Sequence, residues 1–168
     1  ADFATYPSGG HRIAYLSGVA WQKMLVIGNS SRRGWVEETL FNPHYSQRLA
    51  FNLPHVNGKP PEGCPSGGKN IPVQSWNMRR RLEAHVFTDC ADERIRGTFV
   101  FAAKDGMAFR GKNRATVVMH GADTIARGVE LEQAEGGRVD ATLVQVTPYE
   151  TASGKESAGF HFAPGDRG

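Results

Sequence analysis

The residues with the clearest chemical potential are cations that alternate with other residues between Arg94 and Arg114. Two strand-like runs flank Lys104-Asp105-Gly106-Met107, which is a plausible hairpin turn. A three-residue loop, Asp105-Gly106-Met107, separates the two faces of this hairpin cleanly, whereas a two-residue loop places cations opposite phenylalanines. In the favoured register one face is apolar and the other gathers cations without an acid: Arg94, Arg96, Arg110, Lys112 and Arg114.

A basic sheet face of this kind is typical of proteins that track a phosphate backbone, because guanidinium and ammonium groups neutralise phosphates and release counterions. A second basic cluster, Arg79-Arg80-Arg81, comes after Trp76, whose ring could stack on a base. The sequence therefore predicts a nucleic-acid-binding surface of Arg79, Arg80, Arg81, Arg94, Arg96, Arg110, Lys112, Arg114 and Trp76. In the competing interpretation the same cations form a solvated face and meet acids from elsewhere, such as Asp92, Glu93, Glu130 or Glu132.

One stretch resembles a phosphate-binding loop without meeting its requirements. Gly63-Cys64-Pro65-Ser66-Gly67-Gly68-Lys69-Asn70 nearly matches G-x-x-x-x-G-K-[ST], but Asn70 replaces the hydroxyl that binds magnesium. The prolines on both sides, at Pro60-Pro61 and at Pro72, exclude the strand and helix between which such a loop must lie. Nucleotide hydrolysis is not expected.

Metal and catalytic motifs are missing from the sequence. Its six histidines are scattered, with no C-x-x-C or H-E-x-x-H spacing, and His85 and Cys90 fall on opposite faces of one predicted strand. No serine stands in G-x-S-x-G, and the adjacent acids Glu37-Glu38 and Asp92-Glu93 face apart in a strand. We predict no metal, cofactor or catalytic residue and favour a non-enzymatic protein, although a carboxylate pair could assemble from distant strands.

The elements that must position these residues are short strands. β-Branched and aromatic runs, separated by glycines, predict strands at His11–Leu16, Trp21–Gly28, Trp35–Phe41, Gln47–Leu53, Leu82–Asp89, Ile95–Ala103, Ala115–His120, Thr124–Leu131 and Arg138–Thr147. The best helix candidate is a turn or two near Pro43–Arg48, and no fixed-period repeat is evident. Short strands without alternating helices predict an all-β fold, either a single-domain antiparallel β-barrel or a β-sandwich.

One strand carries a resemblance. The stretch His11-Arg12-Ile13-Ala14-Tyr15-Leu16-Ser17-Gly18-Val19 resembles the first strand of OB-fold single-strand binders. The likeness extends no further along the chain, so it implies an OB-like barrel only as one option among barrels.

The chain is expected to form one β-rich domain over residues 1–151, with a C-terminal tail at 152–168 in which Phe160 and Phe162 could pin an added edge strand. The proline- and glycine-rich stretch from Pro54 to Pro72 predicts a long irregular loop. Loop and tail are candidate contacts for protein partners.

Composition bounds the function classes. The 168 residues are 39% hydrophobic and 22% charged, with a net charge of +3, which is ordinary for a folded domain and only mildly basic. No apolar run approaches the roughly 20 residues of a membrane span. Two cysteines, Cys64 and Cys90, and the glycosylation triplet Asn29-Ser30-Ser31 leave the compartment open.

The sequence supports three hypotheses. The first is a non-catalytic nucleic-acid-binding domain, as a subunit of a larger nucleoprotein assembly. The second is an exported β-sandwich with a Cys64–Cys90 disulfide, which binds a glycan or a protein through Trp21, Trp35 and Tyr45. The third is a structural component of a multi-subunit assembly. The basic face favours the first.

Overall fold

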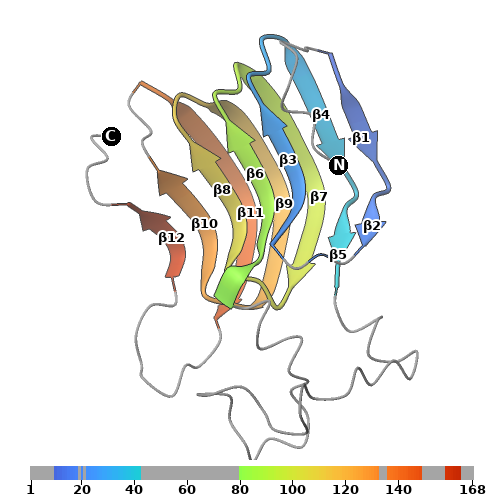
Figure 1. Cartoon of the computed structure of the whole chain (residues 1–168), viewed down its shortest axis with the longest axis vertical. Coiled ribbons are helices and arrows are strands. Elements are labelled where there is room, and N and C mark those ends of the chain that lie inside the picture. Colours follow the sequence, from blue (N-terminus) through green and yellow to red (C-terminus); the bar gives the residue numbers. More distant parts are fainter. Residues whose placement is uncertain are drawn as a thin grey trace, which may run out of the picture.

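The computed structural model describes residues 10–18, 20, 22–42, 80–132, 136–148 and 158–163, and nearly all of them lie in short strands joined by tight bends (Figure 1). In chain order the strands are β1 (Arg12–Ala14), β2 (Ser17–Gly18), β3 (Lys23–Gly28), β4 (Arg33–Glu37), β5 (Leu40–Phe41), β6 (Glu83–Thr88), β7 (Asp92–Phe101), β8 (Asp105–Arg110), β9 (Arg114–Ile125), β10 (Arg127–Glu132), β11 (Arg138–Pro148) and β12 (Ala158–Phe162). The all-β prediction is confirmed. The predicted strand Gln47–Leu53 and the helix candidate Pro43–Arg48 lie outside the described residues.

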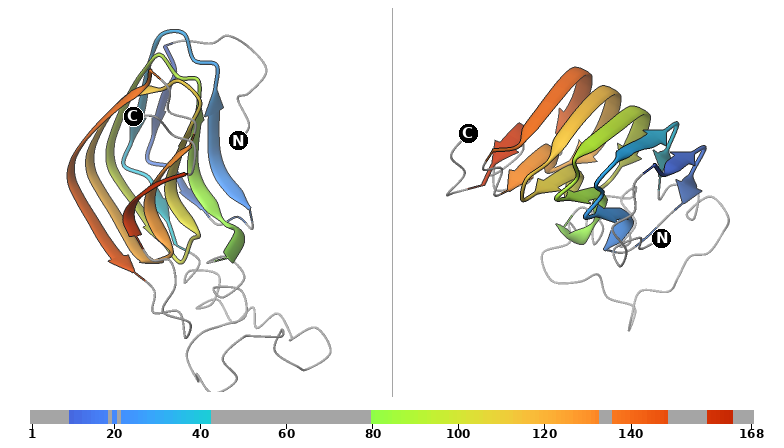
Figure 2. Two further views of the ribbon diagram at one scale, coloured as in Figure 1. Left: turned by 90° about the vertical axis from the view of Figure 1, so that its left-hand side faces the viewer. Right: turned by 90° about the horizontal axis from the view of Figure 1, so that it is seen from above.

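The strands form two sheets that face each other across the core (Figure 2). Sheet A has the order β12-β10-β8-β6-β3. In sheet B the strands β1, β4, β7, β9 and β11 lie side by side, and the short strands β2 and β5 extend it beside the second half of β7. Every strand pair in the described part of the chain is parallel.

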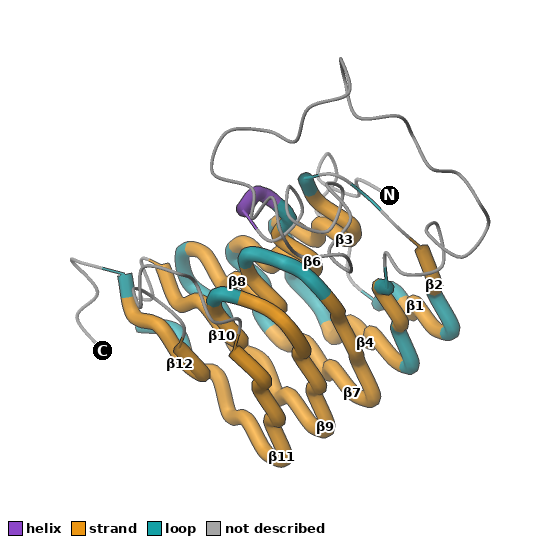
Figure 3. Tube along the Cα trace, turned by 90° about the horizontal axis from the view of Figure 1, so that it is seen from below, coloured by secondary structure: helices purple, strands orange, loops and turns teal. Residues whose placement is uncertain are grey.

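The antiparallel barrel, OB-like or otherwise, and the antiparallel sandwich are therefore wrong. Parallel neighbours need a crossover connection, and the absence of helices had argued against one. Here a strand of the opposite sheet serves as the crossover, so the chain winds as a parallel β-solenoid whose successive coils stack side by side (Figure 3).

The expected hairpin around Lys104–Met107 is also wrong. Its two arms belong to different sheets, since β7 lies in sheet B and β8 begins at Asp105 in sheet A. β8 pairs with β6 on one side and with β10 on the other. After Arg110 the chain turns another corner, at Gly111, which leads back to β9 in sheet B.

A repeat of 22 residues underlies the stacking of the central coils. Arg94 and Thr116, Thr98 and His120, and Arg110 and Glu132 are each 22 residues apart in sequence and touch across one step of the stack. The repeat is hard to recognise in the sequence because many residues at equivalent positions differ in type, as Arg94 and Thr116 do.

The corners recur at equivalent positions and carry left-handed backbone. One corner bends sheet B in every coil, at Tyr15, Glu38, Gly97, Met119 and Leu143, all with positive φ. Another, between sheet A and sheet B, stacks Asn29, Asp89 and Gly111, also with positive φ. Asn, Asp and Gly tolerate this conformation, whereas Tyr, Met and Leu adopt it at a cost that the coil geometry imposes. The side chains of Tyr15, Met119 and Leu143 are consequently exposed.

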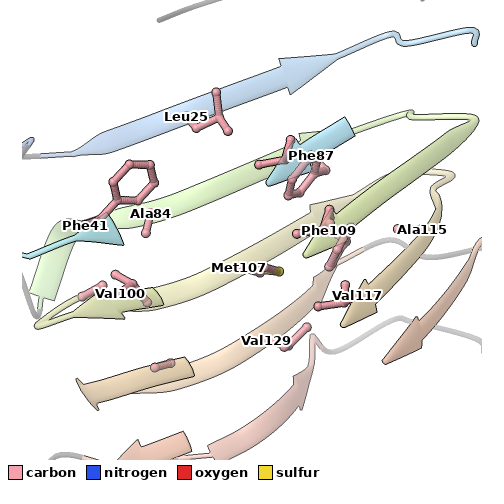
Figure 4. Packing of buried hydrophobic residues seen from close by; sticks show 14 of the residues in the cluster. Leu25, Phe41, Ala84, Phe87, Val100, Met107, Phe109, Ala115, Val117 and Val129 are labelled. Atoms are coloured by element: carbon pink, nitrogen blue, oxygen red, sulfur yellow. The ribbon is translucent and has the colours of Figure 1, made fainter. Parts of the chain in front are cut away.

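The core consists of side chains stacked from coil to coil (Figure 4). In sheet A the register aligns Ile27, Phe87, Phe109 and Leu131, and the Phe87 and Phe109 rings stack at 5.2 Å between centroids. The stack ends on β12, where Phe160 and Phe162 lie on an edge strand that pairs with β10 alone. There 45% and 64% of these two residues remain exposed, beside a 380 Å³ cavity.

Candidate anion-binding site

Six arginines share the outer side of sheet B before its corner. β4, β7 and β9 alternate inward apolar residues, such as Val36, Ile95 and Val117, with outward polar ones, so the two-residue period directs the arginines away from the core. We call this surface the arginine face, with its cations at Arg12, Arg33, Arg94, Arg96, Arg114 and Arg138.

Parallel register arranges the arginine face in rows that run across the coils. One row contains Arg33 beside Asp92 and, further along, Arg114 beside Arg138. The next contains Arg12, Trp35, Arg94, Thr116 and Asp140, each paired with the one before. A third contains Glu37 beside Arg96. Among the described residues the face thus carries six cations, three carboxylates and one exposed aromatic ring, that of Trp35.

A cavity of about 660 Å³ is hollowed into this face, in the size range of small-molecule sites. It is lined by Ala91, Asp92, Arg94, Arg114, Ala115, Thr116, Gly136, Gly137, Arg138 and Asp140. The small residues at Ala91, Ala115, Gly136 and Gly137 leave the space, and the arginines supply N–H donors around it.

The arginines of the cavity differ in how far they are neutralised. Arg94 pairs with Asp92 at 3.1 Å and donates to Thr116 Oγ1 at 2.8 Å, while Arg33 holds the other oxygen of Asp92 at 2.8 Å. Arg138 pairs with Asp140 at 2.9 Å. Within the part of the chain that the structure describes, the guanidinium of Arg114 has neither a hydrogen bond nor an ion pair.

Arg114 therefore presents an exposed guanidinium, with no donor engaged by a described residue, on the wall of a cavity and one step along the stack from a second arginine. This arrangement can bind a carboxylate, sulfate or phosphate group through paired N–H donors.

The structure divides the predicted basic face between two places. Arg94, Arg96 and Arg114 do lie together on the arginine face. Arg110 lies on sheet A instead, where it binds Glu83 through two hydrogen bonds and Glu132 at 2.7 Å. These bonds, with that to Glu83 foremost, raise the pKa of Arg110 despite its partial burial, so this arginine is a structural ion-pair centre.

The other described residues of the predicted site lie outside the sheet B strands that carry the arginine face. Lys112 is exposed at the corner between β8 and β9, where its backbone N–H donates to Asp89 Oδ1 at 2.9 Å. Arg80 and Arg81 are exposed just before β6. Trp76 and Arg79 lie outside the described residues, as do the loop from Pro54 to Pro72 and most of the tail.

Three arginines of the face, Arg12, Arg33 and Arg138, were not among the predicted site residues, and Trp35 was predicted only as a contact for a glycan or protein partner. The signal that finds them is positional. Each of the three arginines is the first residue of a sheet B strand, and the strands align once the repeat is recognised.

Other polar groups with chemical potential, among them Glu93 and Cys90, are buried inside the protein. Glu93 is fully buried and contacts His11 Nε2 at 3.1 Å; burial raises the pKa of Glu93, with His11 acting against the rise. Cys90 is buried and free, and Cys64 lies outside the described residues. In the described ranges no group of His, Cys, Asp and Glu side chains has the geometry to hold a metal ion.

Comparison with known proteins identifies no relative: no family model, no curated protein and no solved structure matches this chain. Among the described residues there is no helix of the length and apolarity needed to cross a membrane.

Proposed function

We propose that the protein is a non-catalytic binding protein that holds an extended polyanion along its arginine face. The observation that carries the proposal is the guanidinium of Arg114, which has no partner among the described residues and lines a 660 Å³ cavity, with Arg138 beside it in register. An exposed cation in an open cavity binds an anionic group without first breaking an ion pair.

The stacked coils supply the extended shape that a polymer requires. Adjacent parallel strands lie about 4.8 Å apart, so the arginines are spaced along the solenoid axis at that interval or multiples of it. Solenoids present such long, regular binding surfaces because each repeat contributes one increment. Nucleic acid, the ligand class that the sequence favoured, is one member of this polyanion class.

Binding of labelled heparin, oligothymidylate and polygalacturonate, measured by fluorescence anisotropy from 20 to 300 mM salt, tests the proposal. We expect affinity for at least one polymer to fall steeply with salt, and Arg114→Gln to make that slope shallower by about 0.7 to 0.9 if nucleic acid is the ligand. Lys23→Gln removes the same charge from sheet A and should leave binding unchanged. If none of the three polymers binds at the lowest salt concentration, the proposal fails.

A further inference from the structure

We propose that the polyanion held by the arginine face is an extended polysaccharide bearing uronic-acid carboxylates, and that nucleic acid is not the ligand. This inference rests on the polyanion-binding function proposed above and specifies its ligand class. Three features of the described face carry it: its carboxylates, its one exposed aromatic ring among the described residues, and the planar donors of Arg114, which has no side-chain partner among those residues.

Carboxylates stand among the arginines in all three rows. Asp92 lies between Arg33 and Arg94 and binds both, and Asp140 lies beside Arg138. A DNA strand laid along these rows would bring phosphates against the two aspartates, and it has no hydroxyl group between its phosphates that could donate to them. Like charges held close together in this way disfavour binding.

A uronate chain matches the same pattern. Its carboxylates accept from the arginines, and the hydroxyl groups between them can donate to acids such as Asp140. Thr116 Oγ1 already accepts from Arg94 and can donate its own proton to a ligand oxygen. Donors and acceptors then alternate on both sides, and no buried charge is left unpaired.

The aromatic content of the face also fits a sugar better than a base. Trp35 is 42% exposed and lies between Arg12 and Arg94 in its row. Proteins that hold single-stranded nucleic acid stack successive bases on several aromatic rings. In the described part of the chain the other large exposed apolar side chains lie at the corner of sheet B or on β12. One ring provides a platform for one sugar ring.

The geometry of Arg114 suits a carboxylate. A guanidinium presents two parallel N–H donors to the two oxygens of a planar carboxylate, whereas a lysine ammonium binds as a point charge. Arg138 lies opposite Arg114 in the register, so two carboxylate-binding donors stand one strand spacing apart beside the cavity.

Isothermal titration of the full chain with oligogalacturonate, its methyl ester and oligothymidylate, all at 50 mM salt, tests the inference. We expect oligogalacturonate to bind most tightly and the neutral methyl ester to bind at least tenfold more weakly. Arg114→Gln should weaken oligogalacturonate binding about tenfold, and Arg114→Lys should bind almost as weakly as Arg114→Gln. Trp35→Ala, made alone, should also weaken oligogalacturonate binding.

The controls separate this inference from the proposed function. The Arg114 side chain is exposed and unpaired in the described part, so its variants should keep the thermal midpoint of the parent protein, and Lys23→Gln should bind as the parent does. Oligothymidylate binding equal to or tighter than oligogalacturonate, or full rescue by Arg114→Lys, overturns the uronate assignment while polyanion binding stands. If neither oligothymidylate nor oligogalacturonate binds and heparin does not bind either, both proposals fail.

Discussion

The imidazole rings of His85 and His120 meet edge to face inside the solenoid, with 6.1 Å between centroids and an interplanar angle of 88°. His85 comes from sheet A and His120 from sheet B, and both are essentially inaccessible to solvent. The Gly106 carbonyl accepts from His85 Nδ1, so His85 Nε2 accepts from the Thr39 hydroxyl and the ring is neutral. Burial lowers the pKa of His85 to about 4. Burial, and then the proximity of His85, lower the pKa of His120 to about 3.

Because His85 and His120 are buried in the neutral form, we expect the fold to lose stability in mild acid. Well above pH 6.5 both histidines are neutral in the folded and the unfolded chain, so they add no pH dependence there. As the pH falls from 6.5 towards 4 the unfolded chain takes up protons that the folded protein refuses, and His85 alone lowers the free energy of unfolding by on the order of 3 kcal/mol. Urea unfolding at pH 7.5, 6, 5 and 4 measures this loss. His85→Gln should be less stable at pH 7.5 but show a shallower decline; equal slopes in parent and variant would contradict the assignment.

A substitution at Gly128 tests how closely β10 packs against β11 and β12. A Cβ there would meet Val146 Cγ2 and lie 2.6 Å from the Gly159 carbonyl oxygen, so Gly128→Ala must push β10 from β11 or β12. We expect a loss of about 1–3 kcal/mol in the free energy of unfolding. Gly159→Ala is the matched control, because nothing lies within 4 Å of its added Cβ. A similar effect of both substitutions on the urea midpoint would show that the close approach at Gly128 is relieved at no cost.

Substitutions at Arg110 and Arg114 should distinguish an arginine that stabilises the fold from one that binds the ligand. Arg110→Gln leaves Glu83, which is mostly buried, without its main partner, and should destabilise the fold by about 1–3 kcal/mol. Arg114→Gln should change stability by less than about 0.5 kcal/mol, since the Arg114 side chain is exposed and has no partner among the described residues. Thermal unfolding of the two variants at pH 7 makes the comparison. The reverse order of effects would contradict the assignment of the two roles.

We expect the Cys90 thiol not to react with thiol reagents in the folded protein. Its thiol lies against the carbonyls of Ile27 and Thr88, and burial, together with the smaller effect of the Glu93 charge, raises its pKa to about 12. Thiolate is the reactive form, so at pH 8 a Cys64→Ser variant should react with a thiol reagent only after unfolding in urea. Rapid labelling of this variant without denaturant would show that the solenoid opens around β6 under native conditions.

Much of the local structure could be read from the sequence. Strands at Trp21–Gly28, Leu82–Asp89 and Arg138–Thr147 were predicted from β-branched runs and overlap β3, β6 and β11 almost end to end. The outward direction of Arg94, Arg96 and Arg114 was inferred from alternation with Ile95 and Ala115, and it held although the assumed hairpin did not. The period of two is a property of a single strand, whichever neighbour it has.

The direction and identity of the neighbouring strands were decided only in three dimensions. An inward Val117 packs equally well beside a parallel or an antiparallel partner, so alternation says nothing about direction. Nor could it tell that Arg110 turns towards Glu83 and Glu132 on sheet A while Arg114, four residues later, begins a strand of sheet B with no side-chain partner in the described part. The sequence by itself determined where most strands lie and the side of residues before the corner of sheet B, such as the inward Ile95 and the outward Arg94. Strict alternation fails at that corner, where Gly97 and Met119 have positive φ. The winding of the coils decided which arginines were neutralised and which were left facing a cavity, because that depends on contacts between residues far apart along the chain.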